Sequence, residues 1–203
     1  LAQSAARGSD GAAAPAGRFV VGAGLDPTIA DGPVSGPGVS LHGGYERRIG
    51  RSRWGVRLAG DWVRGSARYA APPAPGLPDG DDVHRITTIF GGGLYATYAL
   101  SRAPVRSFLE PYALAGLGIQ QLSLRHEGTR RWQGPNAWSQ TIHAAPVRRN
   151  TAAYTAGLGL AARPGPAALF VEGRLTALPA GGARGDRAGV ATLLAPLTFG
   201  VRF

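Results

Sequence analysis

The chain has 203 residues and a formal net charge of +10, which arginine carries because the sequence contains no lysine. The absence of cysteine excludes disulfide bonds and thiolate metal sites. Its 32 glycines and 16 prolines are many for a helical protein, and its 17% of charged residues lies below the usual value of about 25%. Part of its surface is therefore expected to face something other than water.

The N-terminal stretch has no periodic pattern. Its first residues, LAQSAA, resemble the small-residue end of a removed export signal. Residues 1–17 are rich in alanine, glycine and serine, and they are predicted to form a flexible lead-in to one folded domain at 18–203. The longest uncharged runs, 86–101 and 188–201, are shorter than the roughly 18 residues that a membrane helix needs. No transmembrane helix is therefore predicted.

The rest of the sequence alternates apolar with small or polar residues, which predicts β-strands with two different faces. The predicted strands are 18–25, 38–48, 51–64, 83–100, 108–125, 151–162, 167–178 and 188–203. Every second connection between them is short. In an up-and-down antiparallel sheet, this alternation places the tight turns and both termini at one end and the long loops at the other.

One face of these strands is strongly apolar, and the other is mostly glycine with scattered charges. In strand 108–125, Leu117 and Ile119 share the apolar face, whereas Glu110 and Tyr112 lie on the other. A soluble barrel hides its apolar face inside and exposes polar residues. Glycine suits a water-facing strand poorly, but it leaves room for large neighbours inside a narrow barrel. The pattern therefore favours the inverted arrangement, with the apolar face toward lipid and the polar face inside. Aromatic residues also fall on the apolar face, most of them near strand ends: Tyr45, Trp54, Trp62, Tyr98 and Tyr154.

Strand register follows from the tight turns. Two-residue turns are predicted at 49–50 and 164–165. They place two pairs of polar-face residues opposite one another: Glu46 and Arg53, and Gly157 and Glu172. Both registers keep like faces together, as a half-buried sheet requires.

The sequence ends in LTFGVRF, which resembles the C-terminal signal of bacterial outer-membrane barrels. That signal has a terminal aromatic with apolar residues two, four and six places before it, and the matching positions are Phe203, Val201, Phe199 and Leu197. The segments EPYALAGLGI (110–119) and LFVEGRL (169–175) also look like strands of this kind. From about residue 18 to 203, the chain resembles the small eight-stranded outer-membrane barrels of Gram-negative bacteria, such as the OmpA transmembrane domain and OmpX.

The resemblance implies an all-β fold, a transmembrane up-and-down antiparallel eight-stranded barrel with both termini in the periplasm. It also implies that the barrel-assembly machinery reads Phe203 during insertion. The alternative is that the Phe203 strand is only a buried sheet edge.

Eight strands enclose a lumen that side chains can fill, so an open pore is not expected. The residues predicted to form a polar network inside are Glu46, Arg53, Arg57, Asp61, Tyr95, Glu110, Tyr112, Glu172, Arg174 and Arg202. Charges in a membrane are costly unless they are paired, so these residues should neutralise one another. The alternative role for them is to line a narrow ion path.

An enzyme is the second alternative, because some small outer-membrane barrels modify lipid A with a serine and a histidine. Ser123 and His126 lie closest to such a set, but residues three apart on a strand point to opposite faces. The geometry of Ser139 and His143, in a predicted loop, is not readable from the sequence. We expect no catalytic residue, no cofactor and no metal, and the scattered arginines do not indicate nucleic-acid binding.

The third long loop concentrates arginine and tryptophan. Its predicted contact residues are Arg130, Arg131, Trp132, Trp138, Arg148 and Arg149. Guanidinium groups match phosphate with paired hydrogen bonds, so these arginines could anchor the rim to phosphorylated outer-leaflet glycolipid. The alternative is a contact surface for another envelope protein, because exposed large aromatics mark such surfaces. Either way, the predicted role is structural or interactive and non-enzymatic.

Overall fold

The computed structural model describes residues 17–26, 38–71, 81–101, 108–132, 138–143, 145–162, 167–179 and 192–203. In these ranges the strands are β1 (Arg18–Asp26), β2 (Gly38–Arg48), β3 (Trp54–Ala71), β4 (Asp81–Ala99), β5 (Leu109–Trp132), β6 (Trp138–His143), β7 (Val147–Ala162), β8 (Ala168–Leu178), β9 (Thr192–Leu194) and β10 (Leu197–Arg202). No helix in this part of the chain is long and apolar enough to cross a membrane. The predicted lead-in at 1–16 lies outside the described residues.

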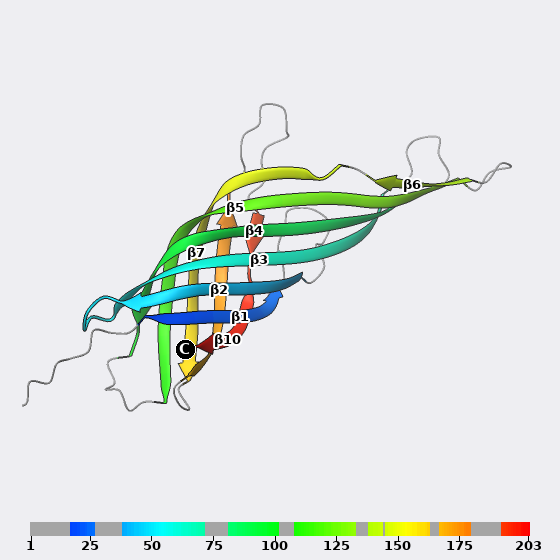
Figure 1. The fold of residues 1–203 in the computed structure, drawn as a ribbon. Coiled ribbons are helices and arrows are strands. Elements are labelled where there is room, and N and C mark those ends of the chain that lie inside the picture. The colour runs from blue at the N-terminus through cyan, green and yellow to red at the C-terminus, as the bar shows by residue number, and fades with distance from the viewer. Residues whose placement is uncertain are drawn as a thin grey trace, which may run out of the picture.

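The strands form one antiparallel sheet that closes on itself (Figure 1). Its order is β10-β1-β2-β3-β4-β5-β7-β8-β9, and β10 also pairs with β8. β9 and β10 are two parts of one strand, because Leu194 opposite Thr176 and Leu197 opposite Gly173 keep the same register against β8. β6 lies off the barrel, on β5. Within the described residues, eight strands therefore close the barrel, which confirms the predicted fold class.

The break between β9 and β10 has a local cause at Pro196, which has no N–H to donate. The Arg174 N–H still donates to the Pro196 carbonyl at 3.0 Å. The Ala195 N–H donates to the buried carboxylate of Asp26 at 3.2 Å, where β1 ends. The strand therefore continues through the break with its hydrogen bonds rearranged.

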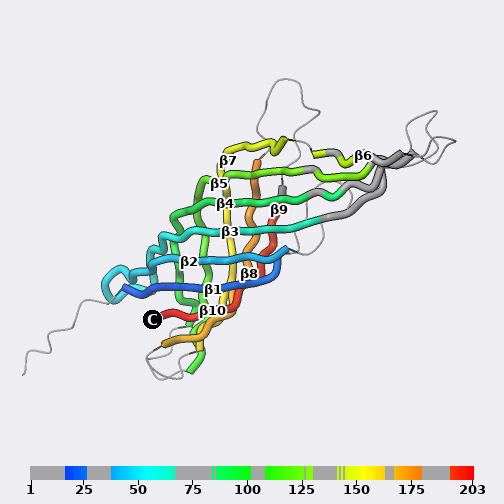
Figure 2. Tube along the Cα trace, turned by 45° about the vertical axis from the view of Figure 1, so that its right-hand side comes forward, coloured from blue at the N-terminus to red at the C-terminus, as the bar shows by residue number. Residues whose placement is uncertain are grey.

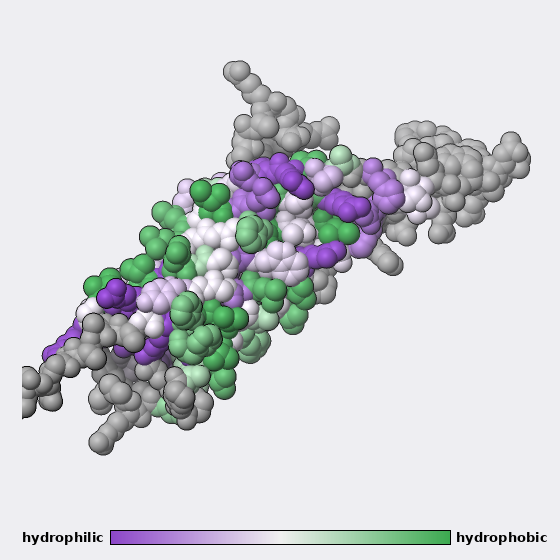
Figure 3. All heavy atoms as spheres, viewed as in Figure 1, coloured by the Kyte–Doolittle hydropathy of each residue, from purple (hydrophilic) through white to green (hydrophobic). Residues whose placement is uncertain are grey.

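The barrel has its apolar face outside. Ile119 is 70% exposed, whereas Arg57, which faces the lumen, is 1% exposed. Figure 3 shows hydrophobic residues over the middle of the face that β1 to β4 form, and hydrophilic residues toward the end where β3 to β5 run on. A closed barrel pairs its backbone groups between strands, which hydrocarbon requires. The exterior and the closure together make this a transmembrane barrel.

Aromatic side chains gather on the outer face near the short-turn end. The Trp54 and Tyr98 rings lie 4.8 Å apart, and the Phe19 and Tyr45 rings lie 5.4 Å apart in an edge-to-face contact. Trp62, opposite Phe90, and Tyr154, opposite Leu117, also lie on the outward face but farther from this end. This arrangement is typical of the girdles of membrane barrels.

Both described ends of the chain lie at the short-turn end. The backbones of Phe19 and Phe203 are hydrogen-bonded to each other, and β10 ends beside the start of β1 (Figure 2). Phe203 is 60% exposed on the outer face, so the alternative of a buried edge is wrong. The Phe203 strand is not a sheet edge, because it pairs with β1 of the same closed sheet.

Several strands are longer than predicted. β3 runs on to Ala71, where it pairs with Asp81 of β4, and β5 continues to Trp132, opposite Trp138 of β6. Figures 1 and 2 show β3, β4 and β5 continuing beyond the ends of β1 and β2. These segments were predicted to belong to the long connections that follow the strands 51–64 and 108–125. They form strands because neighbouring antiparallel strands satisfy each other's backbone groups beyond the barrel wall.

Both predicted registers are wrong by an even number of residues. The β2–β3 turn spans residues 50–53, with the Ile49 N–H donating to the Trp54 carbonyl at 2.9 Å and Gly50 at a φ of +55°. Glu46 therefore lies opposite Arg57.

The β7–β8 register also differs from its prediction: Gly157 lies opposite Arg174 and Glu172 lies opposite Gly159. The predicted turn at 164–165 lies outside the described residues. Because the shifts are even, the side chains within the paired strands keep their predicted faces, whereas Arg53 lies in the turn and does not.

Candidate functional site

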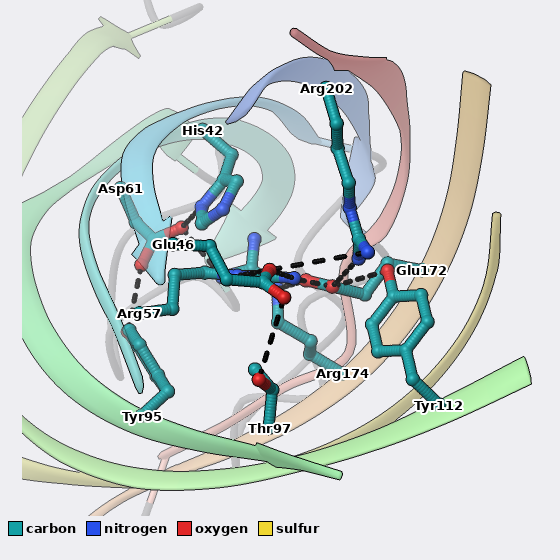
Figure 4. A network of polar contacts seen from close by, with 10 residues as sticks. All are labelled: His42, Glu46, Arg57, Asp61, Tyr95, Thr97, Tyr112, Glu172, Arg174 and Arg202. Carbon is teal, nitrogen blue, oxygen red and sulfur yellow. Dashed lines mark hydrogen bonds and ion pairs between the residues drawn. The ribbon is translucent and has the colours of Figure 1, made fainter. Parts of the chain in front are cut away.

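Six charged side chains meet inside the barrel, and we call them the ionic cluster (Figure 4). They are Glu46, Arg57, Asp61, Glu172, Arg174 and Arg202. They project from β2, β3, β8 and β10, because each occupies an inward position of its strand. The cluster thus joins strands that are far apart in sequence.

Arg57 is the centre of the ionic cluster. Its Nε and Nη2 donate to Glu46 Oε2 at 3.0 and 2.8 Å, and its Nη1 donates to Glu172 Oε2 at 2.7 Å. The Tyr112 hydroxyl donates to the same Glu172 oxygen at 2.7 Å. Charge-assisted bonds from a planar guanidinium fix the geometry strongly. Arg57 thus links β2, β3 and β8 across the lumen.

Asp61 is the second meeting point. Arg174 Nη1 donates to Asp61 Oδ1 at 2.7 Å, and His42 Nδ1 lies 2.8 Å from the same oxygen. The Tyr95 hydroxyl donates to Asp61 Oδ2 at 3.2 Å. Arg174 Nε also lies 3.4 Å from Glu172 Oε1, so the two meeting points form one connected group.

Arg202 lies at the side of the cluster. Its guanidinium is 4.0 Å from both Glu46 and Glu172. It also lies 4.0 Å from the centroid of the Tyr112 ring and 5.2 Å from that of Phe170. A cation over an aromatic face gains electrostatic stabilisation when it is out of water. Arg202 is therefore held by ring contacts as well as by charge.

The ionic cluster is balanced in charge, with three arginines against three carboxylates. A buried charge without a partner is expensive, and removing one member of a buried pair leaves the other uncompensated. Because each charge is compensated by another, the arrangement favours the one strand register that brings these pairs together. Its chemistry is that of a structural core.

The structure brings seven of the predicted interior residues together, which are the six charged residues of the cluster and Tyr112. Tyr95 joins them through Asp61. Glu110 lies elsewhere, paired with Arg48 toward the short-turn end. Arg53 does not enter the lumen. It lies in the turn and donates to the Tyr98 hydroxyl at 3.1 Å on the outer side, because the four-residue turn displaces it from the ladder.

The predicted network lacks two residues that contact the ionic cluster, although the predicted β2–β3 register already places His42 on the inward face, opposite Arg57. His42 contacts Asp61, and the Thr97 hydroxyl lies 3.5 Å from Glu46 Oε1. The signal for His42 was available, because it shares its strand phase with Glu46. The wrong register placed it opposite Arg57 and concealed its partner.

A second group of inward side chains is apolar, and we call it the apolar layer. It consists of Val63, Ile89, Ala153, Leu178 and Leu194, with Leu122 packed against it. Val63 follows Asp61 by two residues on β3, and Leu178 follows Arg174 by four on β8. The layer therefore lies next to the ionic cluster, on its loop side.

Three arginines lie exposed on the outer face at the loop end: Arg64, Arg125 and Arg148. We call them the outer arginines. Arg64 pairs with Thr88, which pairs with Ser123, which pairs with Arg148. Arg125 lies two residues beyond Ser123, so it is the diagonal neighbour of Arg148. Its Nε lies 2.8 Å from Glu127 Oε1.

The structure places the residues of the predicted loop contact in two regions, the β5–β6 hairpin and the start of β7. Arg130, Arg131 and Trp132 belong to β5 and Trp138 to β6, so they lie in a hairpin and not in an irregular loop; their side chains lie outside what the structure describes. Arg148 points outward. Arg149 has the opposite phase, and its Nη2 donates to the Pro179 carbonyl.

The residues of the predicted assembly signal lie along β10 and at the chain end. Leu197, Phe199 and Phe203 are exposed on the outer face, and Val201 is half-buried there. β10 pairs with β1 on one side and β8 on the other. This strand is thus the closing seam of the barrel, whereas its reading by the assembly machinery remains a prediction.

The candidate catalytic residues lie on β5 and β6, so Ser139 and His143 belong to a strand and not to the predicted loop. Ser123 and His126 lie three apart on β5, hence on opposite faces, and His143 of β6 lies opposite Glu127. The His42–Asp61 pair is buried in the lumen. In the described ranges, no group of three or more His, Cys, Asp or Glu side chains is placed to hold a metal.

No protein-family model matches the chain, and no curated protein matches it. Among solved structures it is similar to Ail, the attachment invasion locus protein of Yersinia pestis, with 15% identity and a TM-score of 0.44 over 94% of this chain and 99% of that one. It is similar to Neisserial surface protein A with 17% identity and a TM-score of 0.47 over 92% and 94%. For the N-terminal β-barrel domain of Pseudomonas aeruginosa OprF, the identity is 18% and the TM-score 0.43 over 92% and 97%.

These likenesses are too distant to carry an argument about ligands or partners. The architecture is established by the chain itself, through the closed sheet, the apolar exterior and the charged interior. The fold is that of the small eight-stranded outer-membrane β-barrels.

Proposed function

We propose that this chain is a non-enzymatic outer-membrane barrel whose outer arginines bind the phosphate groups of outer-leaflet glycolipid. The observation that carries the proposal is the exposed, outward position of Arg125 and Arg148 on adjacent strands above the apolar belt. Diagonal neighbours in a sheet lie about 7–8 Å apart between Cα atoms, so two guanidinium groups can reach one phosphate.

The surroundings of Arg64 fit the boundary between headgroups and hydrocarbon. Trp62 precedes it by two residues on the same face and pairs with Phe90, which is 62% exposed. Aromatic rings sit at the interfaces of membrane barrels, and arginine beside them meets the headgroups. Glu127 holds Arg125 from one side and leaves the remaining guanidinium donors for a ligand.

The same geometry supports an orientation with both termini in the periplasm. Outer-membrane barrels have short periplasmic turns and longer extracellular loops. The β2–β3 turn, the start of β1 and Phe203 share one end of this barrel, and the outer arginines lie toward the other. Membrane lipid surrounds the belt, and the barrel-assembly machinery is the proposed partner during insertion.

The test compares Arg125→Gln/Arg148→Gln with the control Arg47→Gln/Arg51→Gln, which removes two exposed arginines at the short-turn end. Folded barrels in nanodiscs are titrated with phosphorylated and dephosphorylated glycolipid. The first variant should lose about tenfold or more in affinity for the phosphorylated form, because a charged hydrogen bond contributes about 1.5–3 kcal/mol. The control should bind normally. Equal binding of both glycolipids by the unchanged barrel would refute the proposal.

A second candidate is contact with another envelope protein, which the β5–β6 hairpin favours. In the described residues β6 pairs with β5 alone, so its other edge offers backbone groups to a further strand. Replacing residues 127–146 by a short Gly/Ser turn keeps the Leu124–Val147 pair and the outer arginines. A folded barrel that keeps glycolipid but loses a co-purifying protein would favour this candidate. A barrel that no longer folds would count against it, because the hairpin would then belong to the scaffold.

A further inference from the structure

We propose that the apolar layer seals the polar interior against the solution at the loop end. The barrel is then a closed pore whose barrier is a dry constriction and not the ionic cluster. This inference does not depend on the glycolipid proposal, because it concerns the lumen alone.

The layer fills much of the lumen. Its five side chains come from β3, β4, β7, β8 and β9, and their exposed fractions lie between 1% and 5%. An eight-stranded barrel is just wide enough for side chains to fill. Side chains projecting from most of the wall therefore leave little room for a path between them.

The remaining strands contribute buried polar side chains at the same level. Ser40 of β2 lies opposite Val63, and Asp26 at the end of β1 accepts the Ala195 N–H at 3.2 Å. Gln120 supplies β5. Asp26, Ser40 and Gln120 are 0%, 3% and 4% exposed, as buried as the apolar residues beside them. The closure therefore extends around the described wall.

The short-turn side of the layer has a different character. Several buried polar atoms there have no hydrogen-bond partner in the protein: His42 Nε2, Thr198 Oγ1, Glu172 Oε1 and Arg202 Nη2. Buried polar groups of this kind are usually satisfied by internal water. Most of the unpartnered atoms in the described residues lie around the ionic cluster, which is therefore suited to water. The five apolar side chains of the layer offer water no partner, although Asp26 Oδ2, Ser40 Oγ and Gln120 Oε1 beside them are also unpartnered.

The difference between the apolar layer and the ionic cluster indicates that the layer is the barrier to ions. A hydrophobic constriction stops ions because water leaves it and an ion cannot enter without losing its hydration. Paired charges can exchange partners and leave a wet path. Removing the apolar side chains should therefore open the lumen, whereas disturbing the ion pairs alone should not.

The first experiment measures single-channel conductance in planar bilayers. Leu178→Ser/Leu194→Ser changes two inward residues, and Leu175→Ser/Leu197→Ser is the matched control on the outward face of the same strands. The inward variant should show stepwise conductance, with open events at least tenfold more frequent than in the unchanged barrel. The control and Glu172→Gln should stay closed. A folded inward variant that stays closed, or a Glu172→Gln barrel that opens, overturns the proposal.

A second measurement covers the case in which the inward variant does not fold. The chain has no cysteine, so Thr198→Cys places a single thiol on the short-turn side of the layer, where Thr198 is buried opposite Glu172. A membrane-impermeant thiol reagent is added at the loop end of proteoliposomes whose orientation is known from protease cleavage. The thiol should be unreactive with the layer intact and at least tenfold faster after Leu178→Ala. Rapid labelling with the layer intact, or no acceleration by Leu178→Ala, overturns the seal.

Discussion

Phe19 and Phe203 join the two ends of the barrel wall. The Phe19 N–H donates to the Phe203 carbonyl at 2.8 Å, and the Phe203 N–H donates to the Phe19 carbonyl at 3.1 Å. Their rings lie 6.1 Å apart on the outer face. The last residue of the chain therefore completes a hydrogen-bonded rung of the closing seam and adds an aromatic ring to the girdle beside it.

Replacing Phe203 by aspartate should reduce the amount of folded barrel in the outer membrane while synthesis stays normal. The change removes the terminal aromatic of the predicted assembly signal and places a charge where the ring now faces lipid. Heat-modifiable migration of the membrane fraction measures the folded share. Phe203→Tyr is the control and should insert normally. Undiminished insertion of Phe203→Asp would contradict the assembly role.

A disulfide across the seam should form in the folded barrel. Val21 and Val201 are register partners and, like Phe19 and Phe203, belong to the hydrogen-bonded type of pair. Such pairs have Cα atoms about 5.5 Å apart, within the range that a disulfide bridges. Val21→Cys/Val201→Cys should therefore cross-link on mild oxidation, as seen on a non-reducing gel. Val21→Cys/Leu197→Cys should not, because Leu197 pairs with Leu25. The reverse result would show a different seam register.

Arginine in the middle of the apolar belt should be costly. Leu117 is 62% exposed on β5, and Ile49 is 55% exposed at the β2–β3 turn. Leu117→Arg should lower the free energy of unfolding in lipid by about 2–4 kcal/mol, and Ile49→Arg by about 0–1 kcal/mol, because the penalty depends on depth. Denaturant titration in lipid vesicles measures both. Equal small costs at the two positions would mean that the belt does not face hydrocarbon.

Glu172 should be the most sensitive member of the ionic cluster. It is fully buried and bonded to both Arg57 and Tyr112, so Glu172→Gln leaves an uncompensated arginine charge in the lumen. The expected loss in free energy of unfolding is about 3–5 kcal/mol. Glu127→Gln, which breaks an exposed ion pair, should cost about 0–1 kcal/mol. If denaturant titration shows the same small loss for both, the cluster does not stabilise the barrel.

The sequence alone determined which way the side chains of the paired strands face. Successive residues of a strand point to opposite faces, so the alternation around Leu117 and Glu172 placed one in lipid and the other in the lumen before any partner was known. The predicted faces survive the two register errors because each register is shifted by an even number of residues. An even slip changes the neighbours of Glu46 and Gly157 without turning them around.

Only the tertiary structure decided which residues meet. Arg57 and Glu172 are 115 residues apart, and their 2.7 Å contact depends on how far each strand slides past the next and on how the sheet curves. The local pattern holds no information about that slide. It is set by turns such as residues 50–53, which carry Arg53 out of the ladder, and by packing across the lumen. The added length of β3 and β5 was hidden for the same reason, because their outer halves are stabilised by each other's backbone groups and not by a periodic apolar face.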